Sequence, residues 1–259
     1  MIDTHVYLSG WPFRRLPDDD PASLCERLRK NGVTQAWTGS FDGVLHRDVT
    51  GVNARLAAEC RDHGDGLLVP FGAIDPTLAN WKDDLRRCVD EHEMPGIRLH
   101  PNYHGYQLDA PEFSELLDEA GERKLVVQIV ARLEDDRTQH PLVQVPATDL
   151  RPLEGLLSTR PDMRIVLSCA IRGPKVTSLA ILAMGRTYFD IATLEGIAGL
   201  KRLIKIMPHE RLLFGSLFPL FYLESAVLKL RESEIGHVAE DAISRGNAAK
   251  LLEPGIPAS

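Results

Sequence analysis

Cysteine is scarce in this sequence, and its cysteines form no paired motif. The four of them, Cys25, Cys60, Cys88 and Cys169, are scattered without C-x-x-C spacing. Zinc knots use closely spaced cysteines, and a few scattered cysteines are not the pattern of a disulfide framework, so neither is expected here. The first three cysteines lie in helix-like segments, where a small buried thiol is the ordinary interpretation.

Excess positive charge and long apolar runs are also lacking. Lysine and arginine number 30 against 37 acidic residues, which gives a formal net charge of -7. Phosphate backbones are bound by clustered basic side chains, so no nucleic-acid partner is expected. No run approaches the roughly 20 apolar residues that span a bilayer, and Met1–His5 lacks the basic start of a secretory signal. We therefore expect no membrane partner, a cytoplasmic location and a small-molecule ligand.

The chain does contain a regular alternation of short apolar runs and helical patterns. Such alternation indicates βα units around a parallel sheet, and 259 residues suit one barrel. The predicted strands are Ile2–Leu8, Thr34–Thr38, Leu68–Ala73, Gly96–Leu99, Val126–Val130, Arg164–Ser168, Tyr188–Ile191 and Leu212–Gly215. The predicted helices are Pro21–Asn31, Val52–His63, Leu78–Glu91, Pro111–Arg123, Leu150–Ser158, Val176–Met184, Ala198–Lys205, Glu224–Glu232 and His237–Leu252. We predict an α/β fold, a single (β/α)₈ TIM-barrel domain over residues 1–259.

Several short motifs follow one another in the order of a known barrel family. They are Ile2-Asp3-Thr4-His5-Val6-Tyr7, Val69-Pro70-Phe71-Gly72-Ala73-Ile74-Asp75-Pro76, Gly96-Ile97-Arg98-Leu99-His100-Pro101, Leu213-Phe214-Gly215-Ser216-Leu217-Phe218-Pro219 and Gly246-Asn247-Ala248-Ala249-Lys250-Leu251-Leu252. Together they resemble the amidohydrolase-related family, whose first strand carries a His-x-His pair and whose eighth strand reads Phe-Gly-Ser-Asp-x-Pro. The resemblance covers nearly the whole chain and is specific for the superfamily, but not for a substrate.

The resemblance implies a divalent metal, often zinc, held by histidines and an aspartate at strand ends. Such a metal lowers the pKa of a bound water and creates a hydroxide nucleophile. Only His5 keeps its expected identity, because Tyr7, Val130, Cys169 and Leu217 stand at the other four positions. The side chains of Val130 and Leu217 have no lone pair that could bind a metal ion. We therefore expect no ordinary metal centre and no cofactor.

Other polar residues near the strand ends are candidates for chemistry. Residues two apart in a strand share a face, which pairs His5 with Tyr7 and Arg98 with His100. If Val130 points into the barrel, Gln128 and Arg132 on either side of it point the same way. We predict His5, His100 and Asp190 as catalytic residues. The predicted substrate-binding residues are Tyr7, Arg98, Tyr103, His104, Gln128, Arg132, His140, Cys169 and Arg172.

Three of these residues are arginines that we expect near one rim of the barrel. Arg98, Arg132 and Arg172 follow or end the fourth, fifth and sixth strands, and guanidinium groups bind carboxylate or phosphate in a bidentate way. An anionic small molecule is therefore the expected ligand. The alternative is that these arginines pair on the surface with acidic neighbours, namely Glu134, Asp135 or Asp136.

Three functional hypotheses remain open on the sequence. The leading one is a metal-independent hydrolase or lyase acting on an anionic small molecule. The second is an inactive pseudoenzyme that serves as a binding or scaffold module. The third is a metal-dependent hydrolase with a relocated site on His5, His100 and His140. Pairing of barrels through outer helices would also make a homo-oligomer, and fold alone identifies no substrate.

Overall fold

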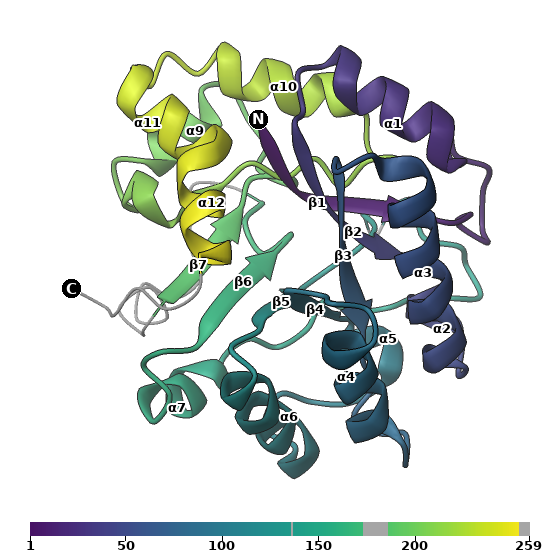
Figure 1. The fold of residues 1–259 in the computed structure, drawn as a ribbon. Coiled ribbons are helices and arrows are strands. Elements are labelled where there is room, and N and C mark those ends of the chain that lie inside the picture. The colour runs from purple at the N-terminus through teal and green to yellow at the C-terminus, as the bar shows by residue number, and fades with distance from the viewer. Residues whose placement is uncertain (136, 173–185, 254–259) are drawn as a thin grey trace.

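Eight parallel strands form the centre of the protein (Figure 1). The structure, a computed structural model, describes residues 1–135, 137–172 and 186–253. The strands are β1 (Ile2–Leu8), β2 (Gln35–Ser40), β3 (Leu68–Ala73), β4 (Gly96–Leu99), β5 (Val126–Val130), β6 (Arg164–Ser168), β7 (Arg186–Asp190) and β8 (Leu212–Leu213). Each strand pairs in parallel with the next one along the chain.

Backbone hydrogen bonds between β1 and the end of β8 bring the sheet almost to closure. The amide of Thr4 donates to the carbonyl of Phe214 (2.9 Å), and the amide of Leu217 donates to the carbonyl of His5 (2.8 Å). One strand edge therefore meets the other, and the chain forms a single nearly closed (β/α)₈ TIM barrel. The predicted fold is confirmed.

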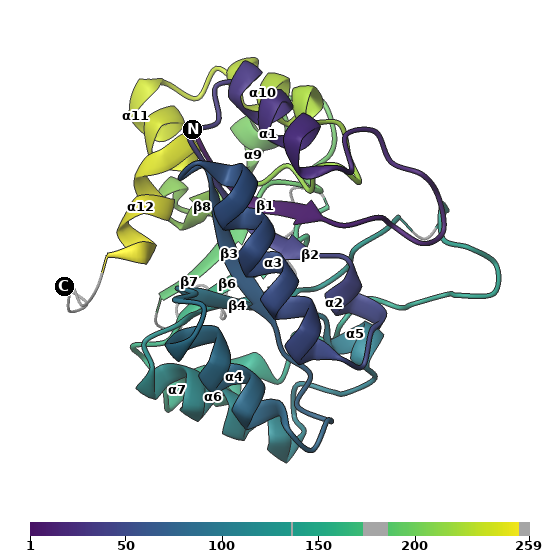
Figure 2. The same ribbon diagram turned by 45° about the vertical axis from the view of Figure 1, so that its right-hand side comes forward.

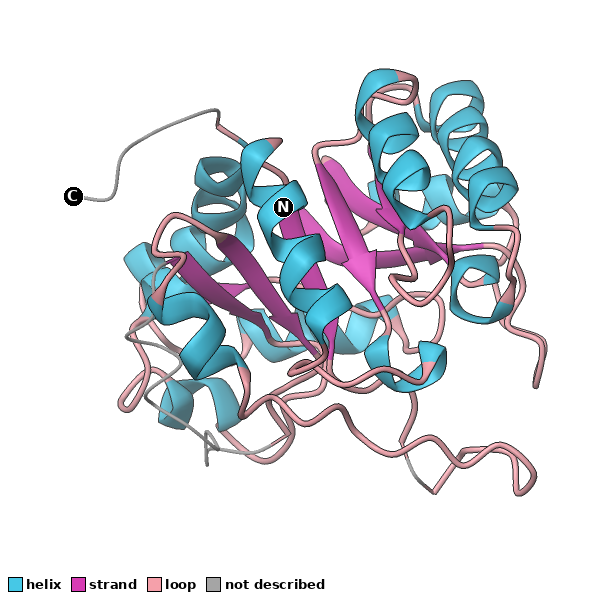
Figure 3. Cartoon of the chain, turned by 90° about the horizontal axis from the view of Figure 1, so that it is seen from below, coloured by secondary structure: helices cyan, strands magenta, loops and turns pink. Residues whose placement is uncertain are grey.

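Helices surround this sheet on its outer face (Figures 1 and 3). They are α1 (Pro21–Lys30), α2 (Asp42–Leu45), α3 (Val49–Gly64), α4 (Trp81–Asp90), α5 (Pro101–His104), α6 (Pro111–Glu122), α7 (Leu153–Ser158), α9 (Gly199–Leu203), α10 (Leu223–Arg231), α11 (His237–Asp241) and α12 (Asn247–Leu252), with the 3₁₀ turn η1 (His209–Arg211) and the π-turn η2 (Ala242–Gly246). The predicted helix 176–184 lies outside the described residues. Among the described helices, none combines the length and the apolar character needed to cross a membrane.

The barrel interior is filled in layers, as strand alternation requires. At the amino-terminal end of the strands the interior is apolar, and the closing helix α12 contributes Ala248 and Leu251 to it. The strand residues of this layer are Trp37, Phe71, Val126, Val166, Tyr188 and Leu213. Two residues further along β4 and β5 come Arg98 and Gln128, which form a polar layer. The carboxyl ends of the strands, where barrel enzymes hold their chemistry, lie beyond it.

Candidate active site

The polar layer consists of one buried arginine and its acceptors. Arg98 is 1% exposed, and its Nε donates to Oε1 of Gln128 (2.8 Å). Its two terminal nitrogens donate to the backbone carbonyls of Val6 (2.7 Å), Trp37 (2.8 Å) and Thr4 (3.2 Å). A Cβ at Gly39 would lie 2.8 Å from the guanidinium, so the barrel wall needs glycine there. Arg98 thus braces β1 and β2 from inside the barrel and does not present its guanidinium at the rim.

A chain of four polar side chains crosses the barrel above this brace. Asp190 at the end of β7 contacts Nδ1 of His5 on β1 through Oδ2 (2.8 Å). The Nε2 atom of His5 lies 3.4 Å from the hydroxyl of Tyr7, and that hydroxyl lies 2.7 Å from Nε2 of His100 after β4. All four side chains are at most 1% exposed. We refer to Asp190, His5, Tyr7 and His100 as the relay.

One arrangement of protons satisfies every donor in the relay. His100 Nε2 donates to the oxygen of Tyr7, the Tyr7 hydroxyl donates to His5 Nε2, and His5 Nδ1 donates to Asp190. The Nδ1 atom of His100 is buried and has no hydrogen-bond partner among the described residues. In this arrangement that atom carries a lone pair, so it is where the relay can accept a proton.

Burial and hydrogen bonds set the charges of the relay. Burial opposes ionisation of Asp190, but hydrogen bonds from His5 and from the amides of Cys169 and Ala192 outweigh it and lower the pKa of the carboxyl. Burial lowers the pKa of His5 and lowers that of His100 further. Burial also raises the pKa of Tyr7. At neutral pH the relay therefore holds one carboxylate, two neutral imidazoles and one phenol.

Small residues and neighbouring helices hold the Asp190–His5 pair in place. A Cβ at Gly215 would lie 2.9 Å from the Cβ of Asp190 and 3.2 Å from that of His5. Lys229 of α10 donates to the carbonyls of Ile191 (2.7 Å) and Ala192 (2.8 Å), which fixes the turn after Asp190. Burial lowers the pKa of Lys229 to about 8. Lys229 could not be predicted as part of the site, because it lies on an outer helix far along the chain from Asp190.

Four of the five positions that the resemblance assigns to metal ligands are packed together in an apolar cluster. We call this set the mouth cluster; its members are Tyr7, Trp11, Leu16, Phe41, Val44, Val130, Leu133, Cys169, Ala192, Leu217 and Leu220. The ring of Phe41 stacks on that of Tyr7 at 4.4 Å, and Trp11 lies 5.2 Å from Phe41. Val130 and Leu217 are 1% and 0% exposed. Side chains therefore fill the place that the resemblance assigns to a metal.

The remaining donors do not fit a metal centre of the family type. In the described part of the chain, one group of three has donor atoms close enough to share a cation: His5, Cys169 and Asp190. Both oxygens of Asp190 already accept hydrogen bonds, one of them from His5 Nδ1. Burial raises the pKa of the Cys169 thiol well above its ordinary value, which disfavours the thiolate that binds metal. Within the same residues, His5, His100 and His140 form no such group, so the relocated site is not assembled.

The other predicted binding residues lie in different surroundings. Tyr103 is half-buried with its ring edge against Trp11 (6.2 Å), and Nε2 of His104 contacts the carbonyl of Gly43 (3.0 Å). His140 is exposed and stacks on Phe13 (5.9 Å).

The arginine rim expected from the sequence is only partly assembled. Arg172 pairs with Asp135 (2.8 Å), as the surface-pairing alternative had it. Arg132 is half-buried in the segment after β5, whereas Arg98 lies inside the barrel with its donors engaged. Three guanidinium groups therefore do not gather at one rim, because Arg98 is directed at backbone carbonyls deeper in the barrel.

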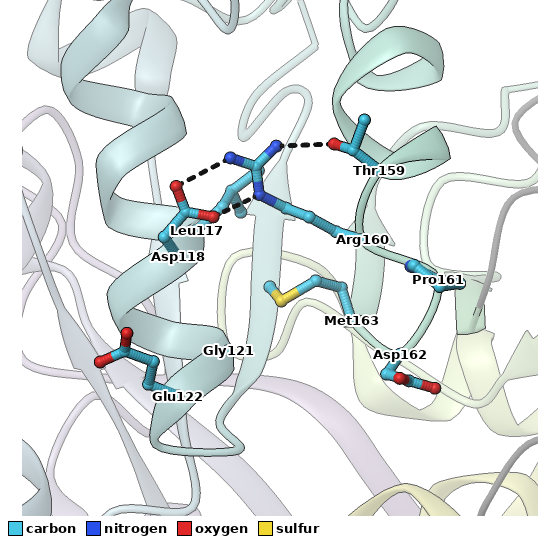
Figure 4. A pocket seen from close by; sticks show the side chains of 9 residues that line it. All are labelled: Leu117, Asp118, Gly121, Glu122, Thr159, Arg160, Pro161, Asp162 and Met163. Atoms are coloured by element: carbon cyan, nitrogen blue, oxygen red, sulfur yellow. Dashed lines mark hydrogen bonds and ion pairs between the residues drawn. The ribbon is translucent and has the colours of Figure 1, made fainter.

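A separate hollow of about 410 Å³ lies on the opposite end of the barrel (Figure 4). It is formed by the end of α6 and the turn before β6, and Arg160 there pairs with Asp118 (2.7 Å). This is the amino-terminal end of the strands, where barrel residues serve stability rather than chemistry. We assign the hollow no part in the site.

The buried Asp3 beneath His5 makes stability depend on pH. Its Oδ1 accepts from the amides of His5 (3.1 Å) and Ser216 (3.0 Å), and burial raises its pKa to about 7. The folded chain holds a proton that the unfolded chain loses near pH 4, so Asp3 lowers stability increasingly as pH rises from about 4 to about 7. The neutral imidazoles of His5 and His100 act in the opposite sense, because burial lowers their pKa values. The contribution of Asp3 is therefore read as a difference: we expect the urea midpoint of Asp3→Asn, relative to that of the wild type, to rise between pH ~4 and ~7.

The matched control for this prediction is Asp62→Asn, since the Asp62 side chain is 60% exposed. Its dependence of the urea midpoint on pH should match that of the wild type. An Asp3→Asn protein whose urea midpoint runs parallel to that of the wild type over this pH range would show that Asp3 is not the responsible group.

The barrel, the relay and the strand-end positions together define a protein of the amidohydrolase type. The chain matches the Amidohydrolase family over residues 2–253 and belongs to that family. No curated protein matches it.

Three similar solved structures agree with this fold. 5-Carboxyvanillate decarboxylase from Sphingomonas paucimobilis has a TM-score of 0.74 and 16% identity, with 97% of this chain and 98% of that chain covered. A dihydroxybenzoic acid decarboxylase from a Polaromonas species, with bound manganese and 2-nitroresorcinol, has a TM-score of 0.69, 16% identity and 97% coverage of both chains. A probable 2-pyrone-4,6-dicarboxylic acid hydrolase from Acinetobacter baumannii, with citric acid bound, has a TM-score of 0.65, 14% identity and coverage of 97% and 98%.

Proposed function

We propose that this protein is a metal-independent member of the amidohydrolase family that carries out a lyase step on a small carboxylate-bearing molecule. The observation that carries the proposal is the relay of Asp190, His5, Tyr7 and His100, whose side chains are at most 1% exposed. Burying polar groups costs free energy, and apolar side chains would fill this end of the barrel at a lower free-energy cost. A connected set of titratable groups at this end is typical of proton transfer.

Each member of the relay has a distinct role in this proposal. Asp190 fixes the tautomer of His5 and stabilises the charge that His5 gains when it takes a proton. Tyr7 passes protons between the two imidazoles, and His100 exchanges a proton with the substrate through Nδ1. A lyase step suits these groups better than hydrolysis, because it needs a proton donor and acceptor but no hydroxide made on a metal.

The substrate class rests on what the similar proteins are named for. Two are decarboxylases of aromatic carboxylic acids, and the structure of the third contains citric acid. A carboxylate ligand also agrees with the small anionic ligand predicted from the sequence. The mouth cluster lies beside the relay, and its members include Trp11 and Leu16 from the segment after β1 and Leu133 from the segment after β5. Both segments extend from the same side of the barrel (Figure 2).

A turnover assay tests this proposal directly. Protein dialysed against a chelator is incubated with a panel of hydroxylated benzoates and small dicarboxylates, and loss of substrate and release of carbon dioxide are followed. We expect turnover of at least one carboxylate at a rate that added zinc or manganese does not raise. Turnover that appears only after metal is restored would contradict metal independence, and no turnover of any compound would contradict the lyase proposal.

A second candidate function is a binding module without catalysis. The mouth cluster favours it, because apolar side chains fill the site that the resemblance assigns to a metal. In that case carboxylates from the panel would raise the unfolding temperature of the protein but would be recovered unchanged. Stabilisation without turnover would therefore favour this candidate over the first.

A further inference from the structure

A buried carboxylate joins the segments after β1 and β5, which both contribute to the mouth cluster. Glu134, in the segment after β5, is 4% exposed. Its Oε1 accepts hydrogen bonds from Nε1 of Trp11 (3.1 Å) and from Nη1 of Arg14 (3.4 Å), both in the segment after β1. Arg14 also donates to the carbonyl of Leu220 (3.4 Å), after β8. The indole and the guanidinium thus meet on a single carboxylate oxygen.

The groups around this oxygen have the composition of a binding site for an aromatic acid. Trp11 is 4% exposed and contacts three aromatic rings, those of Phe13 (5.4 Å), Phe41 (5.2 Å) and Tyr103 (6.2 Å). Phe41 in turn stacks on Tyr7 of the relay. The two groups that donate to this carboxylate therefore lie beside several aromatic rings, and one of these rings, that of Phe41, contacts the relay.

Glu134 is held at this place against a desolvation cost. Burial raises the pKa of Glu134, and the charge of Arg14 and the hydrogen bond from Trp11 only partly offset that effect. If Glu134 returned to water, its carboxylate would regain its hydration. A ligand carboxylate that brings an aromatic ring would also gain contact with the surrounding rings, which Glu134 cannot do.

From these contacts we infer that Trp11 and Arg14 form a carboxylate-binding site for small aromatic acids, and that Glu134 occupies it in the free protein. The inference rests on the proposed function for the identity of the ligand class and names the residues that recognise it. Glu134 acts as an internal competitor. A ligand binds only to the fraction of molecules in which Glu134 has left the site, so its apparent affinity is lowered by that fraction.

Calorimetric titration with benzoate tests the inference without any turnover. The Glu134→Ala substitution removes the internal carboxylate from the site. We expect the variant protein to bind benzoate about tenfold more tightly than the wild type. Adding Arg14→Met to Glu134→Ala should remove this gain. The control is Glu115→Ala on the outer helix α6, where the side chain is 53% exposed; it should bind as the wild type does.

The indole signal of Trp11 locates the binding. In ¹⁵N-labelled protein, benzoate should shift the Nε1–H resonance of Trp11, assigned from its loss in Trp11→Phe, and the shift should occur at lower benzoate concentration in Glu134→Ala. Equal affinity in the wild type and Glu134→Ala, or binding that leaves this resonance unmoved, would overturn the inference. Because the readout is binding, tighter binding without turnover would support this site while contradicting the lyase proposal.

Discussion

Replacing Tyr7 with phenylalanine should lower the turnover of the best panel substrate by about 10²–10⁴-fold, the range that a positioned proton donor contributes. The substitution removes only the hydroxyl that lies between His5 and His100. The ring stays, together with its stacking on Phe41 and its contact with the Arg98 guanidinium (4.7 Å). The buried Nε2 atoms of His5 and His100 lose their partner, so we also expect the free energy of unfolding to fall by about 1–3 kcal/mol. The protein should stay folded, and the fall in rate should be much larger than any loss of folded protein explains. Initial rates and urea unfolding on the same preparation check this.

The matched control is Tyr222→Phe, because the side chain of Tyr222 is 71% exposed. Its rate should equal that of the wild type. If Tyr7→Phe also kept the wild-type rate, protons would not pass through the Tyr7 hydroxyl, and the relay would have a structural role only.

Replacing Arg98 with methionine should lower the free energy of unfolding by about 3–5 kcal/mol, the typical result of removing one partner from a buried charged network. The variant leaves the carbonyls of Thr4, Val6 and Trp37 without their donor. It also leaves the carboxylate of Asp190 buried without the opposite charge of Arg98. Methionine is long enough to fill most of the space, so the loss reports chiefly on charge and hydrogen bonds. Urea unfolding at neutral pH measures it.

Two further variants separate charge from position. Arg98→Lys keeps the charge but cannot donate in several directions at once, so it should recover only part of the lost stability. Arg61→Met removes a guanidinium that is 72% exposed, and should cost less than about 1 kcal/mol. A loss in Arg98→Met as small as that in Arg61→Met would mean that Arg98 does not brace the barrel.

Most of the fold could be predicted from the sequence, because buried parallel strands read as short apolar runs between helical patterns. The predicted limits of Leu68–Ala73, Gly96–Leu99, Val126–Val130 and Arg164–Ser168 agree with the structure. Differences arise where a hydrogen bond from outside the element decides its end. The last strand ends at Leu213 rather than Gly215 because the amide of Phe214 donates to Ile243 in η2.

Capping explains a similar difference in a helix. The helix predicted to begin at Val52 begins at Val49, since Oδ1 of Asp48 accepts from the amide of Gly51 (3.0 Å). The α2 and α5 helices, Asp42–Leu45 and Pro101–His104, were not predicted, because four residues are too few to show a helical period.

The candidate site could be predicted in part. Strand alternation placed His5 and Tyr7 on one face, and the structure brings their polar atoms to 3.4 Å. Alternation gives the face of a side chain but not its depth or its partners. For this reason it could not show that Arg98 lies one layer below His100. The contact between Glu134 and Trp11 was not predicted, because it joins two segments without a period that are more than a hundred residues apart in the chain.

We propose that a proton relay beside the mouth cluster stands where the family resemblance places a metal centre. Metal analysis by mass spectrometry of protein purified without chelator, from cells supplied with zinc and manganese, tests it most directly. We predict substoichiometric zinc and manganese, with content unchanged in His5→Ala. One equivalent of zinc or manganese per chain that survives dialysis and is lost in His5→Ala would contradict the account.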